Sequence, residues 1–162
     1  MKDYSGAVPL EQTADIATTA GSRTIDITTL ADRVMVEAVE YPVGRFPPCY
    51  QRFSLWGDSL TLLGEEVPDG GDCCVYYGSL HTLDGSGSTI PVQYEELIVG
   101  GACGYAAVEE AGGAINTVNI GGAGTVGEWE VWGKEKLTFF RAELKRLGRR
   151  NRVRVRSMYV SV

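Results

Sequence analysis

The sequence predicts an α+β fold: an antiparallel β-meander, then a two-helix hairpin, then an extended C-terminal arm. Three observations support this order. Apolar and polar residues alternate with a period of two between about residues 24 and 80, and the apolar spacing becomes helical after residue 90. The final stretch returns to alternation, with arginines between valines. We expect one domain over residues 1–148 and an arm over residues 149–162, because 162 residues suit a single core.

Strand signals fill the first half of the chain. Tyr4 to Ala14 is expected to form one or two helical turns that Pro9 interrupts. Two alternating runs follow, at about residues 24–28 and 34–39. The dipeptide Gly57-Asp58 joins two further apolar runs and predicts a tight hairpin. A turn at residues 68–71 then leads into a strand rich in Val and Tyr, so the strands of this half form an antiparallel sheet.

Two helices are predicted in the second half. The first runs from Pro91 to about Ala111, since proline suits the first position of a helix. The second runs from about Val126 to Leu147, and Gly148 is expected to end it. Its large apolar residues recur near helical spacing: Trp129, Trp132, Phe139, Phe140, Leu144 and Leu147. A connection of about thirteen residues allows the two helices to pair as an antiparallel hairpin.

Three glycines on the first predicted helix mark a face for close packing: Gly100, Gly101 and Gly104. Each glycine costs a helix roughly 1 kcal/mol relative to alanine, which indicates that another backbone comes close at these positions. The sequence leaves open whether that backbone belongs to this chain or to a neighbouring subunit. Together with Trp129 and Trp132, these glycines are our candidates for subunit packing.

Charge divides the chain in two. Residues 1–133 hold five Lys/Arg and nineteen Asp/Glu, a net charge of −14, whereas residues 134–162 hold ten and two, a net charge of +8. Three interpretations of the basic arm are open. It could contact phosphates, which requires only its positive charge. It could add as a strand to the sheet edge of a partner, which the Val/Arg alternation favours, or it could be a frayed, solvated tail. The candidate partner-binding residues are Arg149, Arg150, Arg152, Val153, Arg154, Val155, Arg156 and Tyr159.

No catalytic, metal or cofactor site is expected. The only histidine, His81, has no nucleophile elbow near it and is predicted to be a structural residue at the end of a strand. The cysteines lack the spacing of a zinc site and are expected to be reduced thiols: Cys49, Cys73, Cys74 and Cys103. The Gly-rich stretch at residues 112–127 lacks a phosphate-binding motif. The paired glutamates are better explained by solvated helix faces than by acid–base chemistry.

The sequence also limits where the protein works. No apolar run approaches the roughly 20 residues of a membrane span. The first residues lack the apolar core of a signal peptide, so we expect the chain to stay on the cytoplasmic side of the cell that makes it.

Three strings, taken in order, resemble the head-tail adaptor (connector) proteins of long-tailed bacteriophages. They are Val75-Tyr76-Tyr77-Gly78, then Ser88-Thr89-Ile90-Pro91-Val92-Gln93-Tyr94-Glu95-Glu96-Leu97-Ile98-Val99, and, after an Ala/Gly-rich helix and a loop, Phe139-Phe140-Arg141-Ala142-Glu143-Leu144. In that family a strand with paired tyrosines precedes a helix that starts with an Ile-Pro motif. The resemblance covers about residues 72–147, and more loosely the strands before them.

The resemblance implies a structural virion protein without catalysis or cofactor. It would form a homo-oligomeric ring, expected to be dodecameric, in the virion neck after assembly in the host cytoplasm. Its partners would be the portal protein, gripped by the C-terminal arm, the next tail or stopper protein, and the double-stranded DNA that passes through. The chain departs from the family at its start, where adaptors usually have amphipathic helices. Two alternatives stay open: a nucleic-acid-binding module that uses the basic arm, and another tail-completion or baseplate component.

Overall fold

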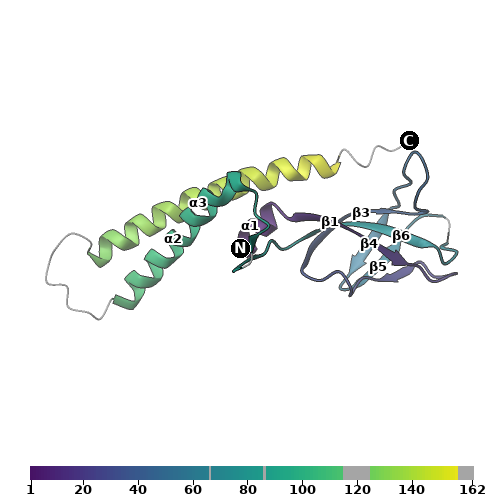
Figure 1. Ribbon diagram of the computed structural model, residues 1–162, viewed down its shortest axis with the longest axis horizontal. Helices are drawn as coiled ribbons and strands as arrows, with labels where there is room; N and C mark the ends of the chain where they lie inside the picture. The colour runs from purple at the N-terminus through teal and green to yellow at the C-terminus, as the bar shows by residue number, and fades with distance from the viewer. Residues whose placement is uncertain (66, 86, 115–124, 157–162) are drawn as a thin grey trace.

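The structure, a computed structural model, describes residues 1–65, 67–85, 87–114 and 125–156, with the backbone alone at residues 151–156. It has a short N-terminal helix, small antiparallel sheets and a long helical hairpin. Figure 1 shows the hairpin projecting away from the sheets, so the molecule is elongated. The predicted α+β class, with antiparallel strands before a two-helix hairpin, is confirmed.

The strands form two three-stranded antiparallel sheets and one short ribbon (Figure 1). The first sheet has the order β1-β6-β3, and the second has the order β2-β5-β4. Their bounds are β1 Leu10–Ala17, β2 Thr24–Asp26, β3 Arg33–Glu40, β4 Phe53–Trp56, β5 Ser59–Leu62 and β6 Asp72–Ser79. The ribbon pairs β7 (Leu83–Asp84) with β8 (Gly87–Ser88). Among the described strands, only β4–β5 and β7–β8 pair neighbours in the sequence, so the sheets are antiparallel as predicted but do not form one meander.

The hairpin predicted at Gly57-Asp58 is confirmed. Trp56 pairs with Ser59 across this two-residue turn, and Gly57 has a φ of 57°, which a residue without Cβ adopts at little cost. The inward side chains of both sheets form one hydrophobic core around Leu60, Leu62 and Val75, each buried. Burial alternates along β5 and the first half of β6, as a half-buried antiparallel sheet requires.

The N-terminal prediction is half wrong. Helix α1 spans Lys2–Ala7, but the chain after Pro9 forms strand β1 instead of a second helical turn. Proline removes a backbone donor and disfavours helical geometry in the residue before it, so the helix stops here. Strand β6 then offers β1 an eight-residue partner, from Leu10 opposite Ser79 to Ala17 opposite Asp72. Local sequence pattern does not predict this pairing, because the partners lie about sixty residues apart.

A second hydrophobic core joins the hairpin to the sheets. Tyr4 of α1 is fully buried among Ile90, Phe140 and Leu144. Its ring lies 5.2 Å from the His81 ring, measured between centroids. Residues from four parts of the chain therefore fix the direction in which the hairpin leaves the sheets.

Helices α2 (Glu95–Gly113) and α3 (Val126–Arg156) form the antiparallel hairpin, after a 3-10 turn at Val92–Tyr94. Their contact is lined with glycine. A Cβ added at Gly101 would lie 2.8 Å from the Phe140 ring, and one at Gly104 would lie 3.2 Å from the carbonyl oxygen of Gly133. The close neighbour that the glycines predicted therefore belongs to this chain at two of the three positions: a backbone at Gly104 and an aromatic ring at Gly101. Gly100 is the exception, since a Cβ there would meet nothing within 4 Å.

The prediction of an extended arm is wrong where the structure describes those residues. Helix α3 continues through Gly148 to Arg156, so residues 149–156 are helical and the helix does not end at Gly148 as predicted. Extending an existing helix adds a hydrogen bond per residue without a new nucleation cost, and arginine is a good helix former. Gly148 lies instead beside α1, and a Cβ built on Gly148 would lie 3.6 Å from the Cα of Ala7. Residues 157–162 lie outside the described residues.

We predict that Gly133→Ala lowers the stability of the hairpin although alanine is the better helix former. The new Cβ would lie 2.8 Å from Val108 and 3.0 Å from the backbone oxygen of Gly104, and a backbone atom cannot rotate away. Overpacking of this kind costs about 1–3 kcal/mol. Gly127→Ala is the matched control on the same helix, because its Cβ meets nothing within 4 Å, and it should be neutral or stabilising by up to about 1 kcal/mol. Urea unfolding of both variants decides; equal effects would refute the close contact.

We also predict that Tyr4→Phe alters the alkaline stability of the protein. Burial, with a smaller effect of Tyr94, raises the pKa of Tyr4 to about 12, and its hydroxyl is a buried group without a hydrogen-bond partner among the described residues. Because an unfolded tyrosine titrates near 10, the wild type should lose stability as the pH rises from about 10 to 12. The variant lacks this loss and should be as stable at pH 7, within about 1 kcal/mol. Identical pH profiles in urea unfolding would contradict this assignment.

Candidate interaction surface on the helical hairpin

Large apolar side chains lie in solvent on the hairpin. On α3, Phe139 is 64% exposed and Val131 is 59% exposed, and on α2 Val99 is 60% exposed. The buried positions of α3 follow one stripe: Gly133, Leu137, Phe140, Leu144 and Leu147. This stripe fills the contact with α2 and α1, so the exposed residues lie outside both hydrophobic cores. We call the exposed apolar residues of α2 and α3 the hairpin surface: Val99, Tyr105, Trp129, Val131, Trp132 and Phe139.

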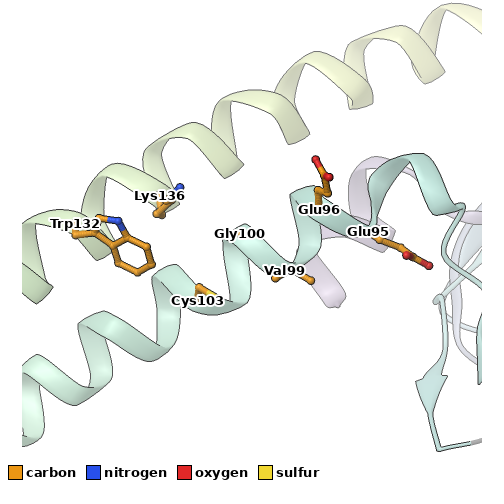
Figure 2. A pocket seen from close by; sticks show the side chains of 7 residues that line it. All are labelled: Glu95, Glu96, Val99, Gly100, Cys103, Trp132 and Lys136. Carbon is orange, nitrogen blue, oxygen red and sulfur yellow. The ribbon is translucent and has the colours of Figure 1, made fainter.

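A shallow groove of about 470 Å³ runs along the hairpin surface between the helices (Figure 2). Its lining residues are Glu95, Glu96, Val99, Gly100 and Cys103 of α2, with Trp132 and Lys136 of α3. Figure 2 shows the Trp132 indole reaching from α3 towards α2. The Lys136 ammonium lies 5.5 Å from the centre of that ring, a distance that allows cation–π attraction. The groove therefore offers an apolar floor with acidic groups at one end.

The groove does not assemble a reactive constellation. Figure 2 shows Glu95 and Glu96 pointing in different directions, and the side chains that could ligate or transfer protons do not converge. Within the described part of the chain, no three His, Cys, Asp or Glu side chains are grouped closely enough to hold a metal ion. What these residues can do together is pack against another apolar surface.

His81 has structural partners. Its Nδ1 lies 3.0 Å from the carbonyl oxygen of Thr89, and its Nε2 lies 3.0 Å from the carbonyl oxygen of Val8. Its backbone N–H donates to the Ser5 hydroxyl at 3.0 Å. The buried ring thus connects the start of the chain, the end of β6 and the approach to α2, in agreement with the structural role predicted for it.

The predicted packing residues separate into two groups. Gly101 and Gly104 are buried between the helices and are not available to a neighbouring subunit. Gly100, Trp129 and Trp132 lie on or beside the groove, and the two indoles meet edge to face with centroids 6.1 Å apart. These three remain candidates for a contact with another molecule.

The predicted arm residues do not form the expected surface. Arg149 and Arg150 are exposed on α3. Five more lie on the helical backbone at the end of α3, where residues two apart no longer share a face: Arg152, Val153, Arg154, Val155 and Arg156. Tyr159 lies outside the described residues. The one-sided row of arginines that favoured strand addition therefore does not exist over residues 149–156.

Sequence reasoning missed Phe139 as a surface residue. Phe139 and Phe140 were both assigned to the apolar stripe of the second helix. Successive residues of a helix point about 100° apart, so only one of the pair can face α2. Phe140 is buried against Gly101, and Phe139 is therefore turned to solvent. The doubled phenylalanine was the available signal, together with Gly133, whose match to Gly104 sets the register.

The two helices carry opposite charge. Helix α2 holds four glutamates and no Lys or Arg, whereas α3 holds ten Lys/Arg and four glutamates. The short ion pairs on α3 join residues of the same helix: Lys134 to Glu130, and Arg146 to Glu143 at 2.8 Å. Such exposed pairs contribute little energy, so the basic character of α3 remains available to a partner.

Comparison of the chain with known protein families, curated proteins and solved structures finds no match. The resemblance to phage adaptors accordingly stays a prediction from the sequence. Neither α2 nor any other helix in the described ranges has the length and hydrophobicity of a membrane-spanning helix.

We predict that Cys103 is the most reactive thiol of the chain. Its side chain is exposed in the groove, whereas burial raises the pKa of Cys73 and raises that of Cys74 to about 11, the latter with help from Asp15. At pH 7.5 a maleimide should modify one thiol rapidly, and Cys103→Ser should abolish that fast phase. The label should also alter the fluorescence of Trp132 in the same groove. A fast phase that survives in Cys103→Ser would contradict this accessibility.

Proposed function

We propose that this protein is a structural, non-enzymatic ring component of the neck of a long-tailed bacteriophage, a head-tail adaptor under the portal. The observation that carries the proposal is the hairpin surface, a set of large apolar side chains on two long helices that the chain itself leaves uncovered. Apolar patches of this kind mark sites of protein association. An adaptor needs such a surface because its fold is completed only beside its neighbours.

The residues that carry the resemblance support the proposal by their position. Ile90 is buried in the second core, and Tyr94 and Leu97 pack against the same core. The tyrosine-rich string lies in β6, the central strand of its sheet. The motif therefore builds the junction between sheets and hairpin. A family that shares this junction would share the direction in which its helices project.

The remaining surfaces suit contacts above and below such a ring. Phe46, on the loop between β3 and β4, is 98% exposed, and Trp56, at the tip of the β4–β5 hairpin, is 89% exposed. Exposed aromatic residues are common anchors at protein interfaces. In our proposal the sheets reach the next tail or stopper protein, and the end of α3 with the residues after it reaches the portal. The acidic body, with a net charge of −14 over residues 1–133, would let DNA pass without adhering.

The test is assembly with the portal protein of the same genome. Co-expressed and purified together, the two proteins should form a complex that holds many copies of the 17.5 kDa chain, measured by light scattering and seen as a ring by electron microscopy. The protein alone is expected to be a monomer or a weak oligomer, since adaptors can assemble on the portal. A chain that stays monomeric and ignores the portal would overturn the proposal.

A further inference from the structure

The outward faces of the two helices are complementary in shape. On α2 the outward residues are small and exposed: Val99, Ala102, Cys103 and Ala106. On α3 the outward residues include two large ones, Val131 and Phe139, and the small Ala142 lies about one turn after Phe139. A smooth face on one side of the hairpin and a projecting face on the other is the arrangement that ridges-into-grooves packing of helices uses.

We propose that the outer face of α3 in one copy packs against the outer face of α2 in the next copy, side by side and at the same height. This contact rests on the proposed ring and names its subunit interface. Its occupant is a second copy of this chain, because the two faces match in shape and height, and in charge at the end that carries Glu95.

The height of the contact follows from the internal register of the hairpin. Gly101 lies opposite Phe140, and Gly104 lies opposite Leu137. Moving one residue along each helix puts Phe139 level with Ala102. Neighbouring copies related by rotation about a ring axis keep the same height, so Phe139 of one copy meets Ala102 of the next. The flanking Val99 and Cys103 then form the sides of the depression that receives the Phe139 side chain.

Charge complementarity supports the same pairing. By this register Glu95 is level with Arg146, and Glu110 is level with Val131, within one turn of Lys134. Arg149, exposed on α3, lies one turn beyond Arg146. Acidic residues of α2 therefore meet basic residues of α3 at the Glu95 end of the contact. At the other end Glu128 and Glu135 lie near Lys134, so the α3 face there carries both signs. Electrostatic matching of this kind fixes the register of a contact and discourages wrong ones.

The acidic face of α2 also bears on the symmetry. The two faces lie on opposite sides of the hairpin, since each is turned away from the contact between α2 and α3. A two-fold dimer through the α2 faces would set Glu95, Glu109 and Glu110 against their own copies. A head-to-tail contact joins unlike faces, and contacts of that type close into rings when the rotation allows.

Phe139→Asp should weaken this contact without unfolding the chain, because the side chain is exposed. We expect the assembled fraction with portal to fall about tenfold or more, the change that about 1.4 kcal/mol produces. Leu83→Asp is the matched control: Leu83 is 59% exposed, on the β7–β8 ribbon, and should assemble normally. Far-ultraviolet circular dichroism checks that both variants stay folded. Normal assembly of Phe139→Asp would overturn the interface.

Cross-linking decides the geometry. In a Cys103→Ser background, Ala102→Cys and Ala142→Cys place one thiol on each outer face, about one helical turn apart in height, within reach of a short bismaleimide. In the portal-bound assembly the double variant should give a ladder of multimers. Each single variant should give no more multimers than the Cys103→Ser protein alone, because a head-to-tail contact brings unlike faces together.

Each outcome has one meaning. Dimers from a single variant would show like faces in contact and overturn the interface. An assembly that forms normally but yields no ladder would overturn the interface and leave the proposed function standing. Failure of every variant and of the wild type to assemble with portal would overturn the proposed function, and this interface with it.

Discussion

The close approach of α2 and α3 determines much of what the protein presents to other molecules. At Gly104 and Gly133 the two backbones meet with no room for a side chain, and at Gly101 the Phe140 ring packs directly on α2. Successive helical residues point about 100° apart, so Phe139 cannot share the face of Phe140. Phe139 is therefore turned to solvent, where it is 64% exposed. The internal packing of the hairpin thus produces its external surface.

That surface is useful only if the hairpin is held firmly. Tyr4 packs α1 against α3, and Gly148 of α3 lies beside Ala7 at the end of α1. His81 ties the residue after α1 to the turn that precedes α2 through two carbonyl oxygens. The junction is therefore built from short-range contacts of residues that are distant in sequence. A rigid junction reduces the freedom that each subunit would lose on assembly, which favours association.

The sequence predicted what local pattern and turn chemistry determine. The β4–β5 hairpin and the positions of β3 and β6 are confirmed, whereas α2 begins at Glu95, after a 3-10 turn that follows Pro91, and not at Pro91 itself. Strand β1 was missed because its reason to be extended is β6, a distant partner. The end of α3 was misjudged because alternation of Arg and Val was taken as a strand signal, although a helix of over twenty residues precedes it. The surface role of Phe139 depends on the register that Gly133 sets, and register is a property of two helices together.

The charge division of the chain changes meaning once α3 is known to continue. The sequence predicts a basic arm attached to an acidic body, yet half of the ten Lys/Arg of residues 134–162 precede residue 149 and lie on the body of α3. The opposing acidic helix is α2, which has no basic residue at all. The stretch of α3 that runs beside α2, residues 128–146, holds five Lys/Arg and four glutamates, so the basic excess lies at the C-terminal end of α3. The polarity therefore runs from acidic α2 to the basic end of α3. In the proposed interface that end of α3 meets Glu95 of the next copy, and the apolar residues beyond it would supply the affinity.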